Sequence, residues 1–328
     1  MEPPHGRPEG GSHRGAKRGG LVMSARGDRL WEGWRPQAGA ARSLEGMPRG
    51  SDAGESFGGA ATVSRPPGKR ARITAITSGK GGVGKTFLSA NLAAALAARG
   101  ERVLVLDADL GLANLDVVLN LEPKITLHDV FTGAATLDDA ILDAPGDFSV
   151  LLAGSGLVEY SRLTPEVRTQ LENIVETLAP RYDRILLDTG AGISDVVLYA
   201  VSLADEALVI ATPEPTSMTD AYATIKVLVT QQQRRAIRLV VNQVSQNGEG
   251  RAIRNQLQLV LDRFVVPRVK ALAEPLKLDL LGEIPLDPSV REAVQKRRLL
   301  LESMPGSPAS IAVGSIAERL AQPVSALR

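Results

Sequence analysis

Short hydrophobic runs alternate with amphipathic segments along the chain from residue 73 onward. Each run is rich in β-branched residues or leucine without polar alternation, which is typical of a strand buried on both faces. The runs are RITAITS, RVLVLD, SVLLAG, RILLD, EALVIAT and IRLVVN, and DLLGEIPLD adds a later strand. We therefore expect a sheet that is covered by helices on both sides.

The segments between these runs have helical periodicity or are rich in alanine. They are 86–98, 164–179, 217–232 and 251–264, and 288–298 and 309–321 follow the last strand. Alternating strands and helices predict an α/β fold with one doubly wound, mostly parallel sheet. Ligands of such sheets bind at the carboxyl ends of the strands. We predict one domain over residues 73–328.

Residues 1–72 have a different composition and no sustained period of 3.6 or 2. They hold 15 of the 32 glycines, several prolines, and 13 Lys/Arg against 7 Asp/Glu. We predict a disordered Gly/Arg-rich leader, because such a composition cannot bury a core. A basic arm for nucleic acid or membrane is one alternative. Another is that translation starts at Met23 or Met47.

Composition excludes several functions. The chain has 328 residues, 44% of them apolar, and no cysteine, so it can form a large core but has no thiol chemistry and no cysteine-ligated metal cluster. No apolar run is long enough to span a bilayer or to form a signal peptide, so we expect a cytosolic protein. Residues 73–328 have a charge balance of −5, which makes nucleic acid an unlikely partner.

The stretch GKGGVGKT lies between the first predicted strand and the first predicted helix. It fits G-x-x-x-x-G-K-[ST], in which backbone N–H groups and the helix N-terminus hold phosphates. We expect Lys85 to reach the β- and γ-phosphates and the Thr86 hydroxyl to ligate Mg²⁺. The predicted nucleotide-binding residues of this loop are Gly79, Lys80, Gly81, Gly82, Val83, Gly84, Lys85 and Thr86.

Carboxylates follow two other predicted strands. Asp107 and Asp109 end RVLVLD and its continuation, and Asp188 ends RILLD. In a phosphate-binding fold, one such carboxylate holds Mg²⁺ and another orients the attacking water. We assign Asp188 to the metal and Asp109 to the water. Asp107 serves either the metal or the amides of the phosphate loop, and the sequence leaves both options open.

The nucleoside end of the site has weaker signals. Asn242 ends the strand IRLVVN and can donate to and accept from a purine edge, although asparagine at a strand end is also a common turn former. Pro285 and Asp287, in EIPLD, are further candidates for this pocket. Aromatic residues are few after position 72, so base stacking is not an obvious means of recognition.

Lys80 gives the loop a second lysine, directly after its first glycine. A phosphate cradle needs one lysine, and in most contexts the other would point to solvent. This arrangement resembles the deviant Walker A motif of the MinD/ParA class of ATPases, which belong to the SIMIBI type of P-loop NTPases. The resemblance implies an ATP hydrolase that forms a homodimer on ATP binding, with Lys80 reaching the partner's phosphates as a catalytic residue.

Four further strings narrow the resemblance. DADLGLANLDVVLNL, LLDTGAGIS, TPEPTSMTDAYATIK and PGSPAS are similar to the FlhG/FleN group of MinD-like ATPases over about residues 73–321. The resemblance implies control of flagellar number and placement. The string TPEPTSMTDAYATIK predicts a proline-containing loop and a helix capped near Ser217 or Thr219.

The resemblance also suggests partners. Many FlhG proteins stimulate the GTPase FlhF through a DQAxxLR segment, and residues 1–72 contain no such string, so activation of FlhF stays open beside basal-body or regulatory proteins. Ile311, Ile316 and Leu320 are expected to cover the core rather than to anchor the chain. A peripheral location at the inner face of the cell membrane stays an alternative.

Three other classes of protein also use a phosphate-binding loop of this kind. A metabolic P-loop ligase or kinase would need an insert that forms a second substrate pocket, and no such insert is evident. A metal-cluster carrier needs cysteine, which the chain lacks. A division-site or DNA-partition ATPase of the MinD/ParA class remains the alternative to the flagellar function.

Overall fold

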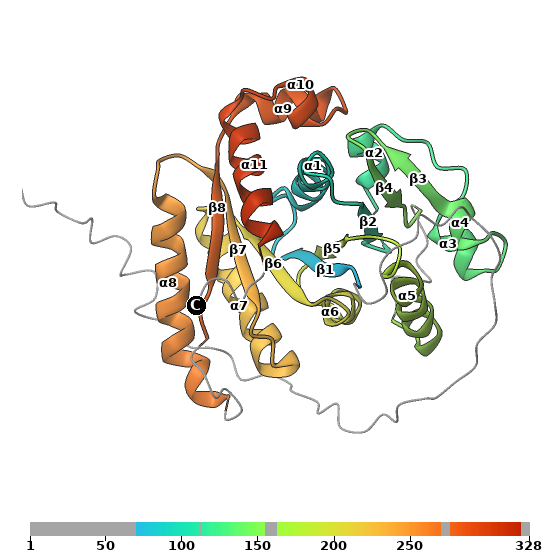
Figure 1. Ribbon diagram of the computed structural model, residues 1–328. Coiled ribbons are helices and arrows are strands. Elements are labelled where there is room, and N and C mark those ends of the chain that lie inside the picture. Colours follow the sequence, from blue (N-terminus) through green and yellow to red (C-terminus); the bar gives the residue numbers. More distant parts are fainter. Residues whose placement is uncertain (1–69, 112, 155–162, 270–275, 323–328) are drawn as a thin grey trace, which may run out of the picture. The chain divides into compact units, whose positions relative to one another are not determined.

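The computed structural model describes residues 70–111, 113–154, 163–269 and 276–322. The chain divides into the units Met1–Val63 and Ser64–Arg328, and every described residue belongs to the second. The second unit contains an eight-stranded sheet in the order β3-β4-β2-β5-β1-β6-β7-β8, with helices on both faces (Figure 1). The predicted α/β doubly wound architecture is confirmed.

The strands pair almost entirely in parallel. They are β1 Arg72–Ser78, β2 Val103–Ala108, β3 Ile141–Ala144, β4 Phe148–Leu151, β5 Arg184–Ala191, β6 Glu206–Ala211, β7 Ile237–Val244 and β8 Asp279–Pro285. Only β3, at the edge of the sheet, runs antiparallel to its neighbour β4. Every residue of β2 and β6 is buried. Strands between two helical layers contact apolar groups on both sides, which explains their continuous hydrophobic runs.

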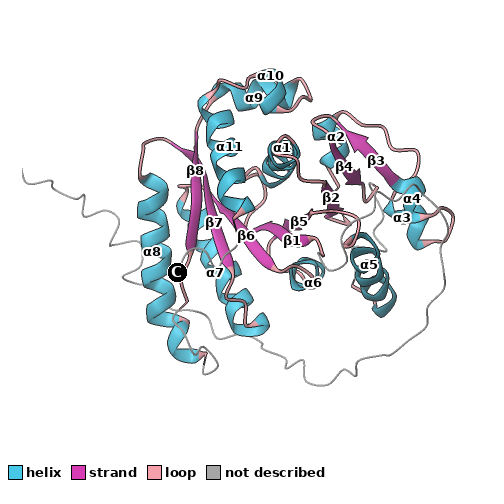
Figure 2. Ribbon diagram, in the orientation of Figure 1, coloured by secondary structure: helices cyan, strands magenta, loops and turns pink. Residues whose placement is uncertain are grey.

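The helices form a layer on each face of the sheet (Figure 2). They are α1 Lys85–Ala97, α2 Leu115–Leu119, α3 Leu127–Phe131, α4 Leu137–Ala140, α5 Pro165–Leu178, α6 Asp195–Ser202, α7 Pro215–Gln232, α8 Glu249–Phe264, α9 Pro288–Gln295, α10 Leu300–Ser303 and α11 Pro308–Ala321, with a 3-10 turn at Val266–Arg268. Helices α1 and α11 pack together on one face, and α6, α7 and α8 cover the other. None of the described helices is long and apolar enough to cross a membrane.

The six predicted helices and seven predicted strands are all present. One predicted detail is wrong, because neither Ser217 nor Thr219 caps α7. Glu214 is the N-cap residue and Pro215 is the first helical residue, since proline has no N–H that a helix start would need to satisfy. The Ser217 hydroxyl accepts the backbone N–H of Thr212 at 3.0 Å.

The C-terminal helix α11 agrees with the sequence prediction at two of three positions. Ile316 and Leu320 are buried, as predicted for a core-covering helix, but the prediction is wrong for Ile311, which is 61% exposed. Ile311 lies in the first turn of α11, on the side away from the sheet. The predicted leader 1–72 lies outside the described residues except for its last three positions.

Candidate functional site

The order of the strands gathers the predicted site at one edge of the sheet. β1 lies between β5 and β6, and β2 lies next to β5. The carboxyl ends of β1, β2 and β5 are therefore adjacent, which brings the loop after β1 next to the aspartates of β2 and β5. A cleft of about 970 Å³ opens here. Five residues of the loop line this cleft, namely Gly81, Gly82, Gly84, Lys85 and Thr86.

The loop requires glycine for two reasons: some of its residues have a left-handed backbone conformation, and another lies too close to a neighbouring helix for a side chain. Gly82 and Gly84 have φ angles of 77° and 95°, a left-handed region that side chains disfavour. A Cβ atom on Gly79 would clash with the backbone carbonyl of Asp220 in α7. The loop can therefore follow this path, with its N–H groups available to phosphate, only because these positions lack a side chain.

Lys85 lines the cleft, whereas Asp188 is buried, with 3% of its surface exposed, and does not line it. Asp188 Oδ1 accepts the Ser89 hydroxyl at 2.8 Å. Burial raises the pKa of Asp188 to about 6, although hydrogen bonds from Thr86 and Ser89 and the charge of Lys85 oppose the shift. Burial also lowers the pKa of Lys85, against the attraction of Asp188 and Asp109. Both charges are thus poorly solvated, and a bound phosphate with a divalent cation would compensate them.

The two aspartates at the end of β2 lie in different surroundings. Asp109 lines the cleft, where its carboxyl carbon lies against Gly190, 3.3 Å from the position of a Cβ atom on that glycine. Asp107 is 1% exposed, and its Oδ1 accepts the Asp109 N–H at 3.1 Å. It is a register partner of Asp188. Burial, followed by the nearby charge of Asp188, raises the pKa of Asp107 well above its usual range.

Asp107 therefore differs from its predicted surroundings in one respect. Among the described residues, the backbone N–H groups of Asp109 and Leu115 bond to its carboxyl, and no bond from an amide of the phosphate loop is present. Its proximity to Asp188 keeps a contribution to the metal site open. Asp109 has the direct access to the cleft that water orientation requires.

Lys80 lies outside the cleft of its own chain. Its Nζ donates to Glu214 Oε2 at 2.7 Å and to the Thr216 hydroxyl at 3.2 Å. The side chains of Lys80 and Glu214 are 40% and 60% exposed, and Lys80 is absent from the residues that line the cleft. The two lysines of the loop thus point to different places, Lys85 inward and Lys80 along the surface toward α7.

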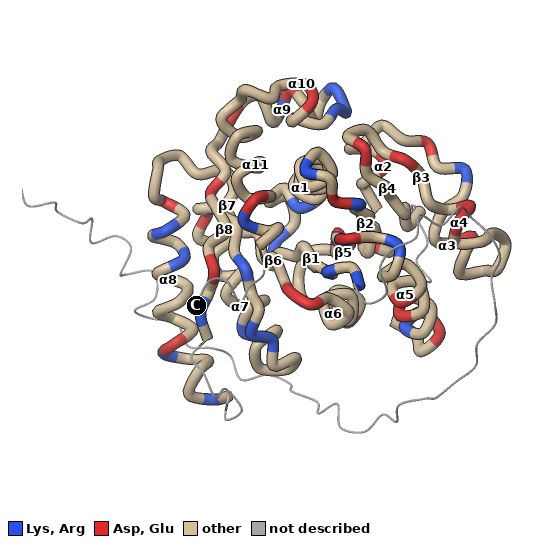
Figure 3. The backbone as a smooth tube through the Cα atoms, viewed as in Figure 1, with Lys and Arg blue, Asp and Glu red and all other residues tan. Residues whose placement is uncertain are grey.

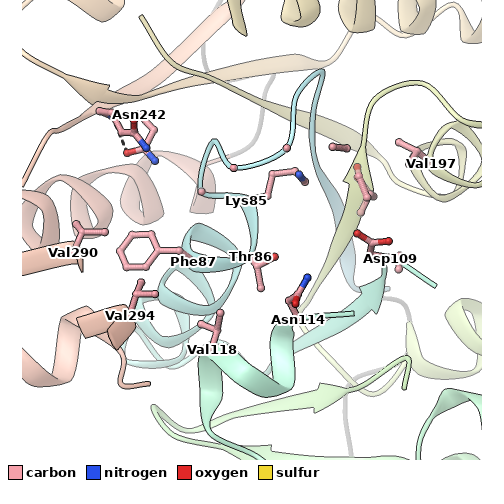
Figure 4. A pocket seen from close by; sticks show the side chains of 18 of the residues that line it. Lys85, Thr86, Phe87, Asp109, Asn114, Val118, Val197, Asn242, Val290 and Val294 are labelled. Carbon is pink, nitrogen blue, oxygen red and sulfur yellow. Dashed lines mark hydrogen bonds between the residues drawn. The ribbon is translucent and has the colours of Figure 1, made fainter. Parts of the chain in front are cut away.

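Asn242 is positioned directly over the loop at the other end of the cleft. Its Nδ2 donates to the Val83 carbonyl at 2.8 Å, and its Oδ1 accepts the Gln243 N–H at 2.9 Å. A Cβ atom on Gly84 would lie 2.6 Å from that Nδ2. One amide hydrogen and one lone pair of Asn242 remain for a ligand. Asn242 thus holds the loop in place and also lines the cleft (Figure 4).

Pro285 and Asp287 both line the same end of the cleft. Asp287 is the N-cap of α9: its Oδ1 accepts Ser289 N–H at 2.9 Å and its Oδ2 accepts Ala309 N–H at 3.0 Å. Burial works against the charged form, but these bonds outweigh it and lower the pKa of Asp287. Both oxygens of its carboxylate thus accept hydrogen bonds that connect α9 to α11. This structural role is separate from the predicted contact with a base.

Several functional side chains were not predicted from the sequence. Ser89 supports Asp188, Glu214 and Thr216 hold Lys80, and Phe87 and Asn114 line the cleft. Ser89 could have been found, since it lies one helical turn after Lys85 on the face of Asp188. The partners of Lys80 could not, because 134 positions separate Lys80 from Glu214.

Known proteins resemble this chain in sequence and in fold. Residues 74–300 match the family described as CobQ/CobB/MinD/ParA nucleotide binding domain. The chain is 42% identical over 249 residues to the antiactivator FleN of Pseudomonas aeruginosa, and the match covers 76% of this chain and 86% of FleN. The motif resemblance to FlhG/FleN is thereby confirmed.

Two solved structures agree with the fold. The cell division ATPase MinD of Pyrococcus furiosus superposes with a TM-score of 0.62 at 30% identity, covering 76% of this chain and 98% of that one. The septum site-determining protein MinD of Pyrococcus horikoshii, complexed with Mg-ADP, gives 0.61 at 29% identity, covering 76% and 96%. Because the family model matches residues 74–300 and the match to FleN covers most of both chains, the chain belongs to the MinD/ParA family of nucleotide-binding proteins.

Proposed function

We propose that this protein is an ATP-dependent switch that dimerises on binding ATP, hydrolyses it slowly and regulates flagellar number and placement. The observation that carries the proposal is the position of Lys80. It belongs to the phosphate loop but lies on the surface, outside the cleft of its own chain. A cation placed there can serve the nucleotide of a second subunit, as an arginine finger does.

The cleft fits ATP with Mg²⁺. The N–H groups of the glycine loop and the N-terminus of α1 suit the phosphates, and Lys85 is the lysine of the loop that lines the cleft. Thr86 and Asp188 are the residues that would hold Mg²⁺, because the Thr86 hydroxyl hydrogen bonds to the buried carboxylate. The ion, when bound, supplies positive charge to the phosphate oxygens. The Pyrococcus horikoshii relative binds Mg-ADP, which supports the same ligand here.

Asp109 is the residue proposed to orient the attacking water. It lines the cleft, whereas Asp107 does not and is bonded instead to the Asp109 backbone. Its position against Gly190 puts it beside the segment Gly190–Ser194, which also lines the cleft in part. This segment could respond to the γ-phosphate, since Gly192 adopts a φ angle of 89° and donates its N–H to the Ser78 carbonyl at 2.8 Å.

Exposed apolar side chains around the cleft support a face-to-face homodimer. Leu286 and Val294 line the cleft and are 67% and 44% exposed. Ile193, between two cleft residues, is 48% exposed, and Val117, beside the cleft residue Val118, is 46% exposed. Apolar groups gathered around a ligand cleft are typical of a surface that a partner covers. Burial of this rim would place the two nucleotides and the two Lys80 side chains at one interface.

The flagellar role rests on similarity to FleN, which is an antiactivator in Pseudomonas aeruginosa. FlhF and basal-body or regulatory proteins are therefore the proposed partners beyond the homodimer. The alternative is a division-site function, favoured by the likeness to the cell division ATPase MinD. DNA partition is less well supported, because basic and acidic residues are interspersed along the described chain (Figure 3).

The dimer is tested by light scattering of the wild type and of Lys80→Ala, each with and without ATP and Mg²⁺. We expect Lys80→Ala to bind ATP as a monomer but to lose the ATP-induced doubling of mass and the hydrolysis. Its matched control is Lys124→Ala, which removes a lysine away from the loop. Full dimerisation and turnover by Lys80→Ala would refute a role across the interface.

The biological role is tested by replacing the chromosomal gene with the Lys85→Ala allele. An altered number or position of flagella, counted by electron microscopy, with normal cell length is the expected result. Filamentous or minicell-forming bacteria with normal flagella would support the division-site alternative instead.

A further inference from the structure

Phe87 is an aromatic side chain in the wall of the cleft, directly after Lys85 and Thr86. It is 8% exposed and lines the cleft. In Figure 4 its ring lies on the side of Asn242, close to Val290 and Val294 of α9, whereas Asp109 lies at the opposite end. Consecutive helical residues point about 100° apart, so Thr86 can face the phosphate end while Phe87 faces away from it.

The cleft is therefore polar at one end and apolar at the other. Glycine N–H groups, Lys85 and Asp109 form the polar end. Phe87 forms the apolar end with Val118, Val290 and Val294. A nucleotide has the same division, with charged phosphates at one end and a flat ring system at the other. Its base can reach the apolar end only if its phosphates occupy the loop.

Hydrogen bonds of Asp287 connect α9, which lines the apolar end of the cleft, to α11. Both carboxylate oxygens of Asp287 are bonded, one at the start of α9 and one to the N–H of Ala309 in α11. This arrangement fixes α9 with its valines beside Phe87. Asn242 stands at the same end, with one N–H and one lone pair left for a ring edge. The site thus offers an aromatic face together with an amide that can bond to a base edge.

We propose that Phe87 is the base platform of this site, on which the purine ring of the nucleotide stacks. This inference rests on the proposed nucleotide function and adds a residue that sets specificity. An aromatic face binds a purine better than a pyrimidine because the overlapping area is larger. Asp287 acts as a positioning residue for the facing wall of α9.

The test compares full-length wild type with Phe87→Leu, which keeps most of the apolar volume but lacks the ring. Titration calorimetry would measure ADP, CDP and inorganic tripolyphosphate in the presence of Mg²⁺. We expect Phe87→Leu to weaken ADP binding about three- to tenfold, to reduce the preference for ADP over CDP and to leave tripolyphosphate binding unchanged. Phe87→Trp should retain tight ADP binding.

Phe131→Leu is the matched control. Phe131 is also 8% exposed, but it lies in α3 and not among the cleft residues. This variant should bind all three ligands as the wild type does. An ADP affinity of Phe87→Leu equal to that of the wild type, or an equal loss for ADP and tripolyphosphate, would overturn the platform role.

A spectroscopic readout covers the case in which Phe87→Leu does not fold. In wild-type protein with labelled phenylalanine, nuclear Overhauser contacts should join one phenylalanine ring to the adenine protons of bound ADP. Phe87→Tyr with the same labelling should lose that contact. Binding of ADP without any contact to a phenylalanine ring would refute the inference alone, whereas failure of the wild type to bind ADP would refute the proposed function itself.

Discussion

Charged groups are buried both at the amino ends of the strands, here called the amino edge, and at their carboxyl ends, here called the carboxyl edge. The two edges differ in what compensates these charges. At the amino ends of the strands, the amino-end cluster consists of Arg72, Arg184, Glu206, Arg238 and Asp279. Glu206 lies 2.8 Å from Arg72 and 3.1 Å from Arg238, and it accepts the Thr74 hydroxyl at 2.9 Å. At the carboxyl ends, Asp107 and Asp188 have raised pKa values and Lys85 has a lowered one.

The difference separates structural charges from functional ones. The carboxylate of Glu206 is surrounded by protein cations and a hydroxyl, and Arg238 also donates to the Gln322 carbonyl at the end of α11. Burial lowers the pKa of Arg238 as well, but the charges that oppose this shift, Glu206 and Asp279, belong to the protein. This edge therefore joins strands and a helix through protein groups alone. At the other edge, desolvation of Lys85 and Asp188 is only partly compensated by the protein. Perturbed charges in a cleft indicate a site that gains stability when a ligand binds.

The largest expected effect is on ligand binding at the carboxyl edge. Lys85→Ala removes the cation that the phosphate loop presents to the cleft, so the affinity for ATP should fall at least about a hundredfold. The free energy of unfolding without nucleotide should change little, because Lys85 is poorly solvated in the folded state. Calorimetry and denaturant unfolding of the same sample measure both. Wild-type affinity would show that the phosphates bind elsewhere.

The opposite outcome is expected at the amino edge. Arg238→Ala removes one partner of a buried ion pair and should lower the free energy of unfolding by roughly 3–5 kcal/mol. ATP affinity should stay within about twofold of the wild type when measured well below the unfolding temperature. Arg251→Ala, on the exposed face of α8, is the control. A loss of ATP affinity in a folded Arg238→Ala would remove the distinction between the edges.

ATP hydrolysis should also depend on an aspartate of the carboxyl edge and not on an exposed aspartate elsewhere. Asp109→Ala should bind ATP normally but lose turnover by about a hundredfold or more, because water orientation contributes to the transition state. Light scattering should then find a persistent ATP-bound dimer. Asp143→Ala, an exposed aspartate of β3, should hydrolyse ATP as the wild type does. Turnover by Asp109→Ala at the wild-type rate would transfer the role to another group.

The stability of the protein should depend on pH through the buried carboxyl group of Asp188. Asp188 has a pKa of about 6 in the folded protein, above the value near 4 of an unfolded aspartate, so the folded state binds the proton more tightly. Stability without nucleotide should therefore fall as the pH rises from about 4 to 6, by on the order of 2–3 kcal/mol. Asp188→Asn should flatten this slope in denaturant titrations. An unchanged slope would assign it to Asp107 or another group.

The smallest effect is expected at the surface pair. Glu214→Gln breaks an ion pair whose partners are 40% and 60% exposed, so the free energy of unfolding should change by less than about 0.5 kcal/mol. Denaturant unfolding at low and high salt measures it. A loss above about 2 kcal/mol would mean that Lys80 is part of the structural framework and is not free to leave for a second subunit.

The sequence predicted the parts of the molecule that depend on local patterns. The glycine loop, its flanking strand and helix, and the aspartates at two strand ends were found because each has a fixed spacing along the chain. The short elements α2, α3, α4 and β3 were not, since four- or five-residue segments carry little periodicity. Tertiary contacts such as Lys80 with Glu214 were also inaccessible, because only folding brings α7 to the loop.

Asn242 has one role that the sequence predicted only as alternatives and another that the sequence did not predict. Its place at a strand end suggested a base contact or a turn, and the structure adds a third task, the bond to the Val83 carbonyl. That bond could be recognised only once β7 and the loop were seen side by side. Asp287 likewise proved to cap α9, a task that its position before a proline and a serine could have suggested.

The contact between Gly79 and α7 has a mechanical consequence. A residue with any side chain at position 79 would force the backbone of Asp220 away from the loop. The start of the loop and the early part of α7 are therefore in direct backbone contact, and α7 cannot move toward the loop without pushing it. A regulator that bound the outer surface of α7 and pushed this helix toward the loop would displace the loop. It could thus change the grip on a nucleotide without entering the cleft.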